Sequence, residues 1–171
     1  MIQNITIIGS GNVATQLSGA FKNASIKINQ LYCRNKKNGK KLAQVLQTEY
    51  VNKISHLKPT DLIVICVNDD SIKHIIQKLP NNPMVHTSGN TSIKVFKNNT
   101  MHGVLYPLQS LNKENNISFK DIPVCIEANC NDFEKELVTL SKIISNQTYI
   151  VNSIKRKKLH LAAVIASNFS N

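Results

Sequence analysis

The 171-residue sequence lacks tryptophan and has only 5% aromatic residues, so it is poorly supplied with the stacking platforms that hold single-stranded nucleic acid. Acidic residues are scarce: Lys and Arg number 21 against 10 Asp and Glu, which favours anionic partners. The basic residues are nevertheless spread along the chain and form no arginine-rich stripe. We expect no nucleic-acid partner, and a basic nucleic-acid binder is a minor alternative.

Long hydrophobic runs are also missing. The longest uninterrupted aliphatic segment, residues 62–67, is far shorter than the roughly 20 residues of a membrane-spanning helix. The N-terminus has no basic stretch followed by an apolar one. We therefore expect a cytoplasmic protein without a membrane partner. With 42% hydrophobic and 18% charged residues, the chain can bury the core of one globular domain.

The cysteines give no sign of a metal site or a disulfide framework. They form no CxxC pair and have no histidine partner at metal-ligand spacing, and three of them lie in apolar runs. A buried thiol behaves as a small hydrophobe. We expect Cys33, Cys66, Cys125 and Cys130 to be reduced core residues, and no metal.

Strand-like apolar runs alternate with helix-like segments along the whole chain. The β-branched run 5–8 leads into a glycine-rich turn and a helical pattern, and the aliphatic run 62–67 is typical of a central parallel strand covered on both faces. Such alternation predicts right-handed β-α-β crossovers. The expected fold class is α/β, with a doubly wound, mostly parallel sheet. Further strands are expected near 26–33, 50–51, 84–87, 102–108, 122–126 and 149–151, and helices near 13–21, 39–47, 72–79, 132–144 and 154–169.

The turn after the first strand matches the G-x-G-x-x-G/A pattern of dinucleotide-binding proteins. Gly9 permits a tight turn, Gly11 lets the backbone approach a pyrophosphate, and Ala14 is small enough for close helix–strand packing. The free amides at the start of the helix then face an anion. We expect dinucleotide binding; the alternative is a similar fold that has lost its ligand. The expected cofactor contacts in this turn are Gly9, Ser10, Gly11, Asn12, Val13 and Ala14.

The residues after the second strand bear on the choice of dinucleotide. An NAD-binding protein places an acid here for the ribose hydroxyls, but this chain has no Asp or Glu between Gly11 and Glu49. Arg34 and Asn35 instead offer a guanidinium and an amide to a 2′-phosphate. The expected cofactor is therefore NADP. The lysines that follow are interpreted as a solvated loop.

Polar residues at the carboxyl ends of later strands are candidates for the rest of the site, because doubly wound sheets bind ligands there. The segment 67–69 should pass beside the nicotinamide ribose, and the segments 86–89 and 106–109 could donate to a substrate or relay a proton. A histidine in a strand is more often a hydrogen-bonded, half-buried residue, and that alternative stays open. The candidates are Val67, Asn68, Asp69 and His86 for the cofactor, and Ser88 and Tyr106 for catalysis.

The last helix is apolar except for one polar stripe. At about 100° per residue, His160 and Ser167 lie close together around the helix axis, with Asn168 on the margin. An ionisable group on so apolar a helix needs a reason, so we expect His160 at the site. The alternative is that these polar residues only cap or leave the helix end. The apolar residues 159–165 should leave an exposed face, because one domain covers a helix on one side only.

Together these motifs resemble a bacterial Rossmann-like family of unknown function. That family is similar to pyrroline-5-carboxylate reductase, the deazaflavin-dependent NADP reductase and, more remotely, 6-phosphogluconate dehydrogenase. The resemblance spans all 171 residues, and the tyrosine-proline-leucine-glutamine and leucine-histidine-leucine segments are its most specific parts. The segments that carry it are 9–14, 67–70, 86–89, 103–109, 126–128 and 159–164.

The resemblance implies a dinucleotide-binding domain at 1–152 and, at 153–171, the first helix of an all-helical domain that forms a homodimer and completes the active site. On this basis the chain looks truncated. In ketopantoate- and hydroxyisobutyrate-type relatives this helix carries a catalytic Lys and Asn; by position His160 replaces the Lys and Asn168 matches the Asn. The implied function is an NADP-dependent oxidoreductase that transfers a hydride to a C=N or C=O group of a small metabolite. A non-catalytic NADP-binding or sensing module that acts through a protein partner is the alternative.

Overall fold

The computed structural model describes residues 1–97, 101–115 and 117–169, with side chains described as far as Ser167. The strands are β1 (Asn4–Ile8), β2 (Lys27–Tyr32), β3 (Glu49–Val51), β4 (Leu62–Ile65), β5 (Met84–His86), β6 (His102–Pro107), β7 (Val124–Ala128) and β8 (Thr148–Ile150). The helices are α1 (Asn12–Asn23), α2 (Lys36–Leu46), α3 (Asp69–Ile76), α4 (Asn131–Ile144) and α5 (Ser153–Phe169). Three short 3-10 turns are η1 (Ile54–His56), η2 (Ile93–Phe96) and η3 (Phe119–Asp121).

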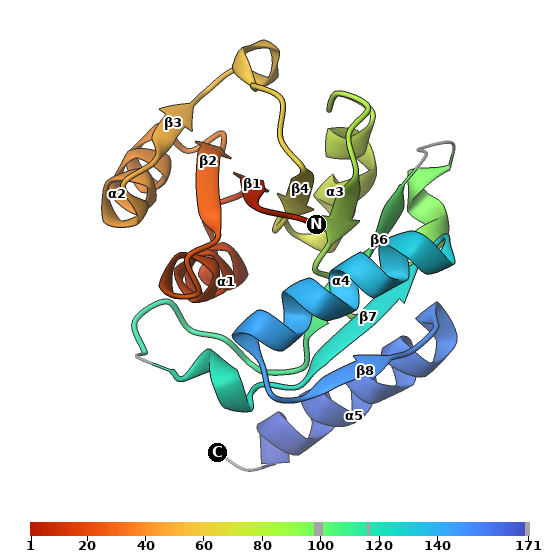
Figure 1. Cartoon of the computed structure of the whole chain (residues 1–171). Helices are drawn as coiled ribbons and strands as arrows, with labels where there is room; N and C mark the ends of the chain where they lie inside the picture. Colours follow the sequence, from red (N-terminus) through yellow and green to blue (C-terminus); the bar gives the residue numbers. More distant parts are fainter. Residues whose placement is uncertain (98–100, 116, 170–171) are drawn as a thin grey trace.

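The strands form one eight-stranded sheet in the order β3-β2-β1-β4-β5-β6-β7-β8 (Figure 1). Every neighbouring pair is parallel except β6 and β7. This sheet confirms the predicted doubly wound, mostly parallel α/β class. β4 pairs with β1 on one side and β5 on the other, and all of its residues are buried, so the prediction of a central strand is also confirmed.

Alternation of side chains along the strands divides the core into layers on the two faces of the sheet. On β1, Ile5 and Ile7 belong to the core formed with α1, α2 and α4, whereas Ile8 packs in the core formed with α3 and η2. A third cluster joins Val104 of β6 to Leu159 of α5. Figure 1 shows α4 and α5 on opposite sides of β7 and β8. Helices therefore cover both faces, as a parallel sheet requires.

The strand order reverses at β1, which pairs with both β2 and β4. In a doubly wound sheet, the crevice beyond the carboxyl ends of the strands at such a reversal is where ligands bind. The turn after β1, the start of α3 and the residues after β5 all leave the sheet at this edge. The fold thus brings the predicted site segments to one edge of the sheet.

The helix α5 carries an apolar strip that faces solvent. Ile154 is 71% exposed, Leu161 60% and Ile165 49%, whereas Leu159 is partly buried against the sheet. The structure therefore confirms the exposed apolar face predicted for this helix. Within the described residues, no helix is long and apolar enough to cross a membrane.

All four cysteines are free. Cys33, Cys66 and Cys125 are buried, as predicted, but Cys130 is exposed just before α4. The prediction of a core position was wrong for Cys130, because this residue lies in the turn that leaves β7 instead of within the strand.

Candidate functional site

The glycine turn has the geometry of an anion cradle. Gly9 has φ +124°, and a Cβ atom there would lie 2.2 Å from the carbonyl oxygen of Cys66, so only glycine lets the turn pack against the end of β4. Gly11 is the N-cap of α1, and a Cβ atom there would meet nothing within 4 Å. No side chain caps α1 through Gly11, so the first amides of the helix face open space. This space at a helix N-terminus suits a phosphate group.

A cavity of about 610 Å³ extends from this turn across the ends of β2 and β4. Arg34 and Asn35, both exposed, form part of its wall after β2. The side-chain oxygen of Asn35 accepts a hydrogen bond from the backbone N–H of Asn38 and caps α2, which leaves its NH₂ group to face a ligand. The other predicted residues in this cavity are Gly9, Ser10, Gly11, Val67 and Asn68.

The same cavity is also lined by residues of α3 and of the turn after it that sequence reasoning missed. Ser71, His74 and Lys78 line it. Their spacing of three and four residues is a helical-face signal that could have found them. Together with Arg34, Lys78 makes this cavity cationic.

A second cavity, of about 400 Å³, adjoins the first and shares Gly11, Cys66, Val67 and Asn68 with it. It is bounded by the turn after β5, the end of β6 and the inner side of α5. The structure therefore brings most of the predicted site residues together along one cleft. Those lining the second cavity are Gly11, Asn12, Val13, Val67, Asn68, Asp69, Ser88, Tyr106 and His160.

In this second cavity the Tyr106 hydroxyl and Nδ1 of His160 are 2.8 Å apart, and their rings meet edge to face with centroids 5.7 Å apart. Burial raises the pKa of Tyr106 to about 12. The phenol is therefore protonated at neutral pH, and where it donates to Nδ1, the ring proton of His160 lies on Nε2. A Cβ atom at Gly89 would lie 2.6 Å from Cγ of His160 and 2.7 Å from Cζ of Tyr106, so only glycine allows this close packing.

Two of the predicted residues support the turn after β5. His86 is fully buried, stacks on Phe96 with ring centroids 5.5 Å apart, and accepts a hydrogen bond at Nδ1 from the N–H of Ser88. Burial lowers the pKa of His86 to about 3, so the ring is neutral. The hydroxyl of Ser88 accepts hydrogen bonds from the N–H groups of Asn90 and Thr91.

The structure therefore corrects the placement of His86. Predicted as a cofactor contact, it lies behind the turn and not in the cleft, because β5 directs its ring toward Phe96. Ala14 is buried in the core and packs α1 against the sheet, the close contact expected of a small residue there. Asn168 lies in the last turn of α5, and its side chain falls outside the described residues.

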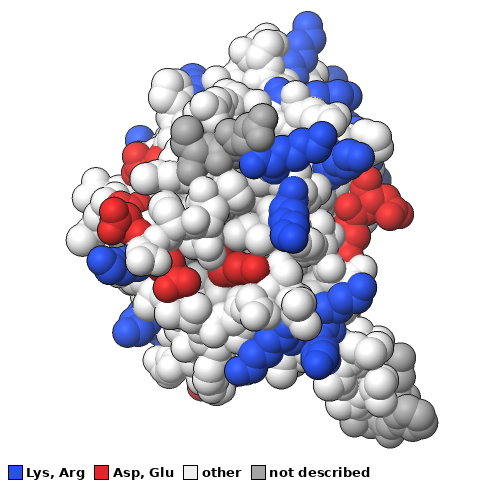
Figure 2. Space-filling view, turned by 90° about the vertical axis from the view of Figure 1, so that its right-hand side faces the viewer, with Lys and Arg blue, Asp and Glu red and all other residues white. Residues whose placement is uncertain are grey.

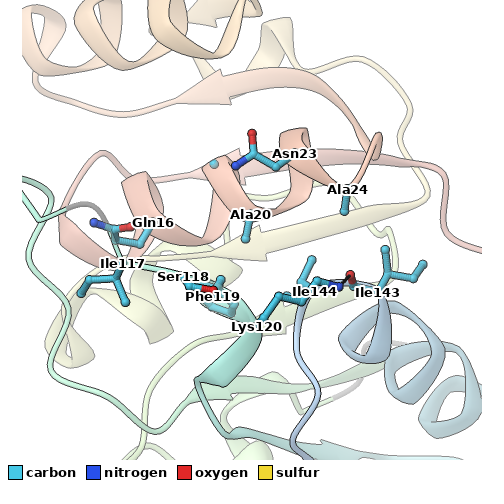
Figure 3. Close-up of a pocket in the computed structure, with 11 residues that line it drawn as sticks. Gln16, Ala20, Asn23, Ala24, Ile117, Ser118, Phe119, Lys120, Ile143 and Ile144 are labelled. Atoms are coloured by element: carbon cyan, nitrogen blue, oxygen red, sulfur yellow. Dashed lines mark hydrogen bonds between the residues drawn. The ribbon is translucent and has the colours of Figure 1, made fainter.

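A cavity of about 620 Å³ lies away from this cleft, between α1, η3 and the end of α4 (Figure 3). None of the predicted site residues lines it. Nε2 of Gln16 donates to the carbonyl oxygens of Asn112 and Asn115, and Nζ of Lys120 donates to that of Ile143. Because these polar groups are paired within the protein, the cleft at the strand ends is the better candidate site.

The chain is similar in sequence and structure to several known proteins. Residues 122–171 match a family profile described as "Domain of unknown function (DUF2520)". BF3122 from Bacteroides fragilis, provisionally designated an NADP oxidoreductase, is 32% identical with a TM-score of 0.91, over 99% of this chain and 68% of that one. TM1727 from Thermotoga maritima is 23% identical with a TM-score of 0.79, over 97% and 64%. An imine reductase from Myxococcus stipitatus in complex with NADP+ is 16% identical with a TM-score of 0.72, over 98% and 62%. No protein of curated function matches the sequence.

The strand order and the glycine turn define an oxidoreductase-like Rossmann fold. The identity to the B. fragilis protein across nearly the whole chain makes the assignment more specific. The chain belongs to the family of that protein, a Rossmann-like family of unknown function, as the sequence motifs predicted. It spans about two thirds of the length of these relatives: 68%, 64% and 62%.

Proposed function

We propose that this chain is an NADP-dependent oxidoreductase that transfers a hydride between NADPH and the C=N or C=O group of a small metabolite. The observation that carries the proposal is the hydrogen bond between Tyr106 and His160, in a cavity that adjoins the glycine turn. The similar imine reductase, whose structure is in complex with NADP+, supports the same reaction class. NADPH supplies the hydride, and the protein supplies position and proton transfer.

The residues of the cleft fit a nicotinamide dinucleotide. The open space beside Gly11 and the first amides of α1 would hold the pyrophosphate. Arg34 and Lys78, which both line the larger cavity, would hold the 2′-phosphate by charge-assisted hydrogen bonds. Asn35 and His74 add two further donors there. On the nicotinamide side, the lining residues Asn12, Val13, Val67, Asn68 and Asp69 would contact the ribose and ring.

His160 is the group we propose for proton transfer. Reduction of a C=N or C=O group needs a proton at the nitrogen or oxygen, and an imidazole at the wall of the cavity can give it. Tyr106, whose pKa is raised to about 12, holds its own proton at neutral pH. Its hydrogen bond to Nδ1 would instead favour one tautomer of His160 and orient the ring. In this proposal His160 transfers the proton, and Tyr106 orients the imidazole ring of His160.

We also propose that residues 153–171 begin a helical region through which two copies associate, separate from the dinucleotide-binding region 1–152. The exposed apolar residues of α5, among them Leu161 and Ile165, support this proposal. Light scattering of the wild type and of Leu161→Ser tests it: the wild type should associate and the variant should shift toward monomer. A wild type that stays monomeric at all concentrations rejects it.

The proposed activity is tested in two stages. NADPH binding is first measured by titration, and NADPH consumption is then followed with a panel of cyclic imines and 2-keto acids. His160→Asn should lower kcat and leave the NADPH affinity unchanged, whereas the control His56→Asn changes an exposed histidine outside the cleft and should alter neither. Binding without consumption of any panel member would favour the non-catalytic module. Absence of NADPH binding would refute the proposal as a whole.

A further inference from the structure

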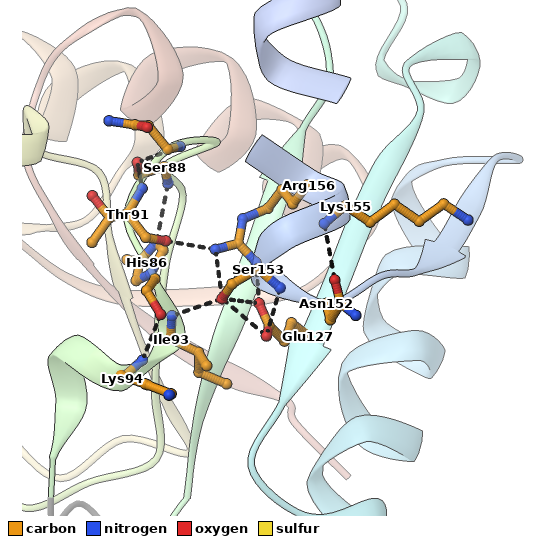
Figure 4. Close-up of polar contacts among 12 residues, drawn as sticks. His86, Ser88, Thr91, Ile93, Lys94, Glu127, Asn152, Ser153, Lys155 and Arg156 are labelled. Carbon is orange, nitrogen blue, oxygen red and sulfur yellow. Dashed lines mark hydrogen bonds and ion pairs between the residues drawn. The ribbon is translucent and has the colours of Figure 1, made fainter. Parts of the chain in front are cut away.

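A buried ion pair joins β7 to α5 behind the cleft (Figure 4). The Arg156 side chain is 1% exposed and that of Glu127 13%. Arg156 donates from Nη1 to the Glu127 carboxylate and from Nη2 to the carbonyl oxygen of Thr91, 2.5 Å away. The same carboxylate accepts from the backbone N–H and the hydroxyl of Ser153, each at 2.8 Å. The cluster therefore fixes the start of α5 with several directed bonds.

This cluster connects three separate segments of the chain. Glu127 belongs to β7, Ser153 and Arg156 to α5, and Thr91 to the turn after β5. The backbone N–H of Ile93 adds a link from that turn to the hydroxyl of Ser153, at 3.1 Å. A large relative displacement of these segments would break several of these bonds.

The same segments carry the groups of the proposed proton-transfer site. His160 lies one helical turn after Arg156 on the same face of α5. Gly89, whose backbone packs against both rings, belongs to the turn that Arg156 holds through Thr91. Tyr106 stands on β6, the direct antiparallel neighbour of β7. The ion pair thus holds all three parts of the site relative to one another.

Stability alone does not account for such a pair. Removing two charges from water costs free energy that their attraction only partly returns, and well-packed apolar residues often stabilise a core as well or better. What apolar residues do not supply is direction, because dispersion contacts are not oriented whereas the guanidinium fork is. The Glu127–Arg156 pair is therefore better suited to setting a position than to adding stability.

We infer that Glu127 and Arg156 are positioning residues, whose ion pair sets where α5 meets the turn after β5 and thereby keeps His160 hydrogen-bonded to Tyr106. The inference rests on the proposed function in one respect, because that function makes His160 the proton-transfer group. Neither residue touches the cleft: both are absent from the described lining of the two cavities. Their effect on His160 is transmitted through α5 and the turn.

The test measures the tautomer of His160 by ¹⁵N NMR of histidine-labelled protein at about pH 8, where an ordinary imidazole is neutral. The main variant is Glu127→Leu combined with Arg156→Met, since losing one partner alone would leave a buried unpaired charge and could unfold the chain. Arg156→Lys is a second variant, which keeps the charge pair but cannot bond the carboxylate and the Thr91 carbonyl with one fork. His160→Asn assigns the signals. Glu49→Gln with Lys58→Met, at an exposed ion pair away from the cleft, is the control.

In the wild type and the control, the two ring nitrogens of His160 should give well-separated signals from one tautomer. In both test variants the separation should shrink by at least half as the tautomers mix, while NADPH affinity stays within twofold of wild type. Wild-type nitrogen shifts in folded test variants would overturn the inference. If the wild type fails to bind NADPH, the proposed function fails, but the tautomer measurement still decides the positioning role.

Discussion

Gly11→Val should remove dinucleotide binding and leave the fold in place. A Cβ atom at Gly11 meets no protein atom within 4 Å, and its φ of −83° is open to any residue. Replacing the N-cap glycine by an apolar residue therefore costs only about 1 kcal/mol of folding free energy. The added side chain instead fills the space before the first amides of α1, where we place the pyrophosphate.

The expected loss of affinity follows from the bonds that the side chain would block. Hydrogen bonds to charged groups contribute about 1.5–3 kcal/mol each. Two such bonds lost from the helix amides amount to about 3–6 kcal/mol, and since about 1.4 kcal/mol is a factor of ten, NADPH should bind more than about 100-fold more weakly.

Calorimetric titration with NADPH and thermal unfolding measure the two effects separately. Gly19→Val is the matched control, because Gly19 lies in the same helix, its Cβ atom would also meet nothing within 4 Å, and it is outside the cleft. This control should bind NADPH as the wild type does, with stability unchanged or slightly higher. A folded Gly11→Val protein with wild-type NADPH affinity would refute the reasoning, since the ligand would then have to lie elsewhere.

Three further predictions concern the cleft and the turn behind it. Arg34→Asp should reverse the preference for NADP over NAD, because it replaces a cation facing the larger cavity by an acid that suits ribose hydroxyls; equal wild-type affinities for the two dinucleotides would contradict the assignment. Tyr106→Phe should lower kcat with little change in NADPH affinity, since His160 loses the bond that orients it, whereas Tyr149→Phe, at an exposed residue on β8, should change neither. His86→Phe should reduce the loss of unfolding free energy that the wild type shows as the pH falls. The buried ring has its pKa lowered to about 3 from 6.5, so the unfolded chain binds the extra proton between these values and stability falls by about 1.4 kcal/mol for each pH unit as the pH drops through that window. Urea denaturation at several pH values measures this slope, and an equal slope in wild type and variant would speak against it.

The sheet and the glycine turn were predictable because their signals are local. The β-branched run before Gly9 and the helical pattern after it specify strand, turn and helix within about twenty residues of sequence. The same holds for β4, whose continuous aliphatic run marks a strand covered on both faces. In each case the residues that make the pattern are also those that make the contacts.

The details of the site were less predictable because they depend on packing between distant segments. Tyr106 and His160 were separate candidates, and only the packing of α5 beside β6 brings them to hydrogen-bond distance. A three-residue strand such as β5 gives too short an alternation to show that His86 points away from the cleft. The ion pair between Glu127 and Arg156 joins two elements through their long side chains, and no sequence periodicity predicts it.

The narrow boundary between the two cavities bears on how inhibitors could be built. Only Gly11, Cys66, Val67 and Asn68 are common to both linings, and the cationic groups and the Tyr106–His160 pair stand on opposite sides of this boundary. An adenosine phosphate fragment and a small carbonyl-like fragment would therefore meet different side chains and need not displace each other. A linker across Gly11 would join the two fragments into one ligand. Once one fragment is bound, the other would be held near its own cavity at a high effective concentration, so the joined ligand should bind more tightly than either fragment.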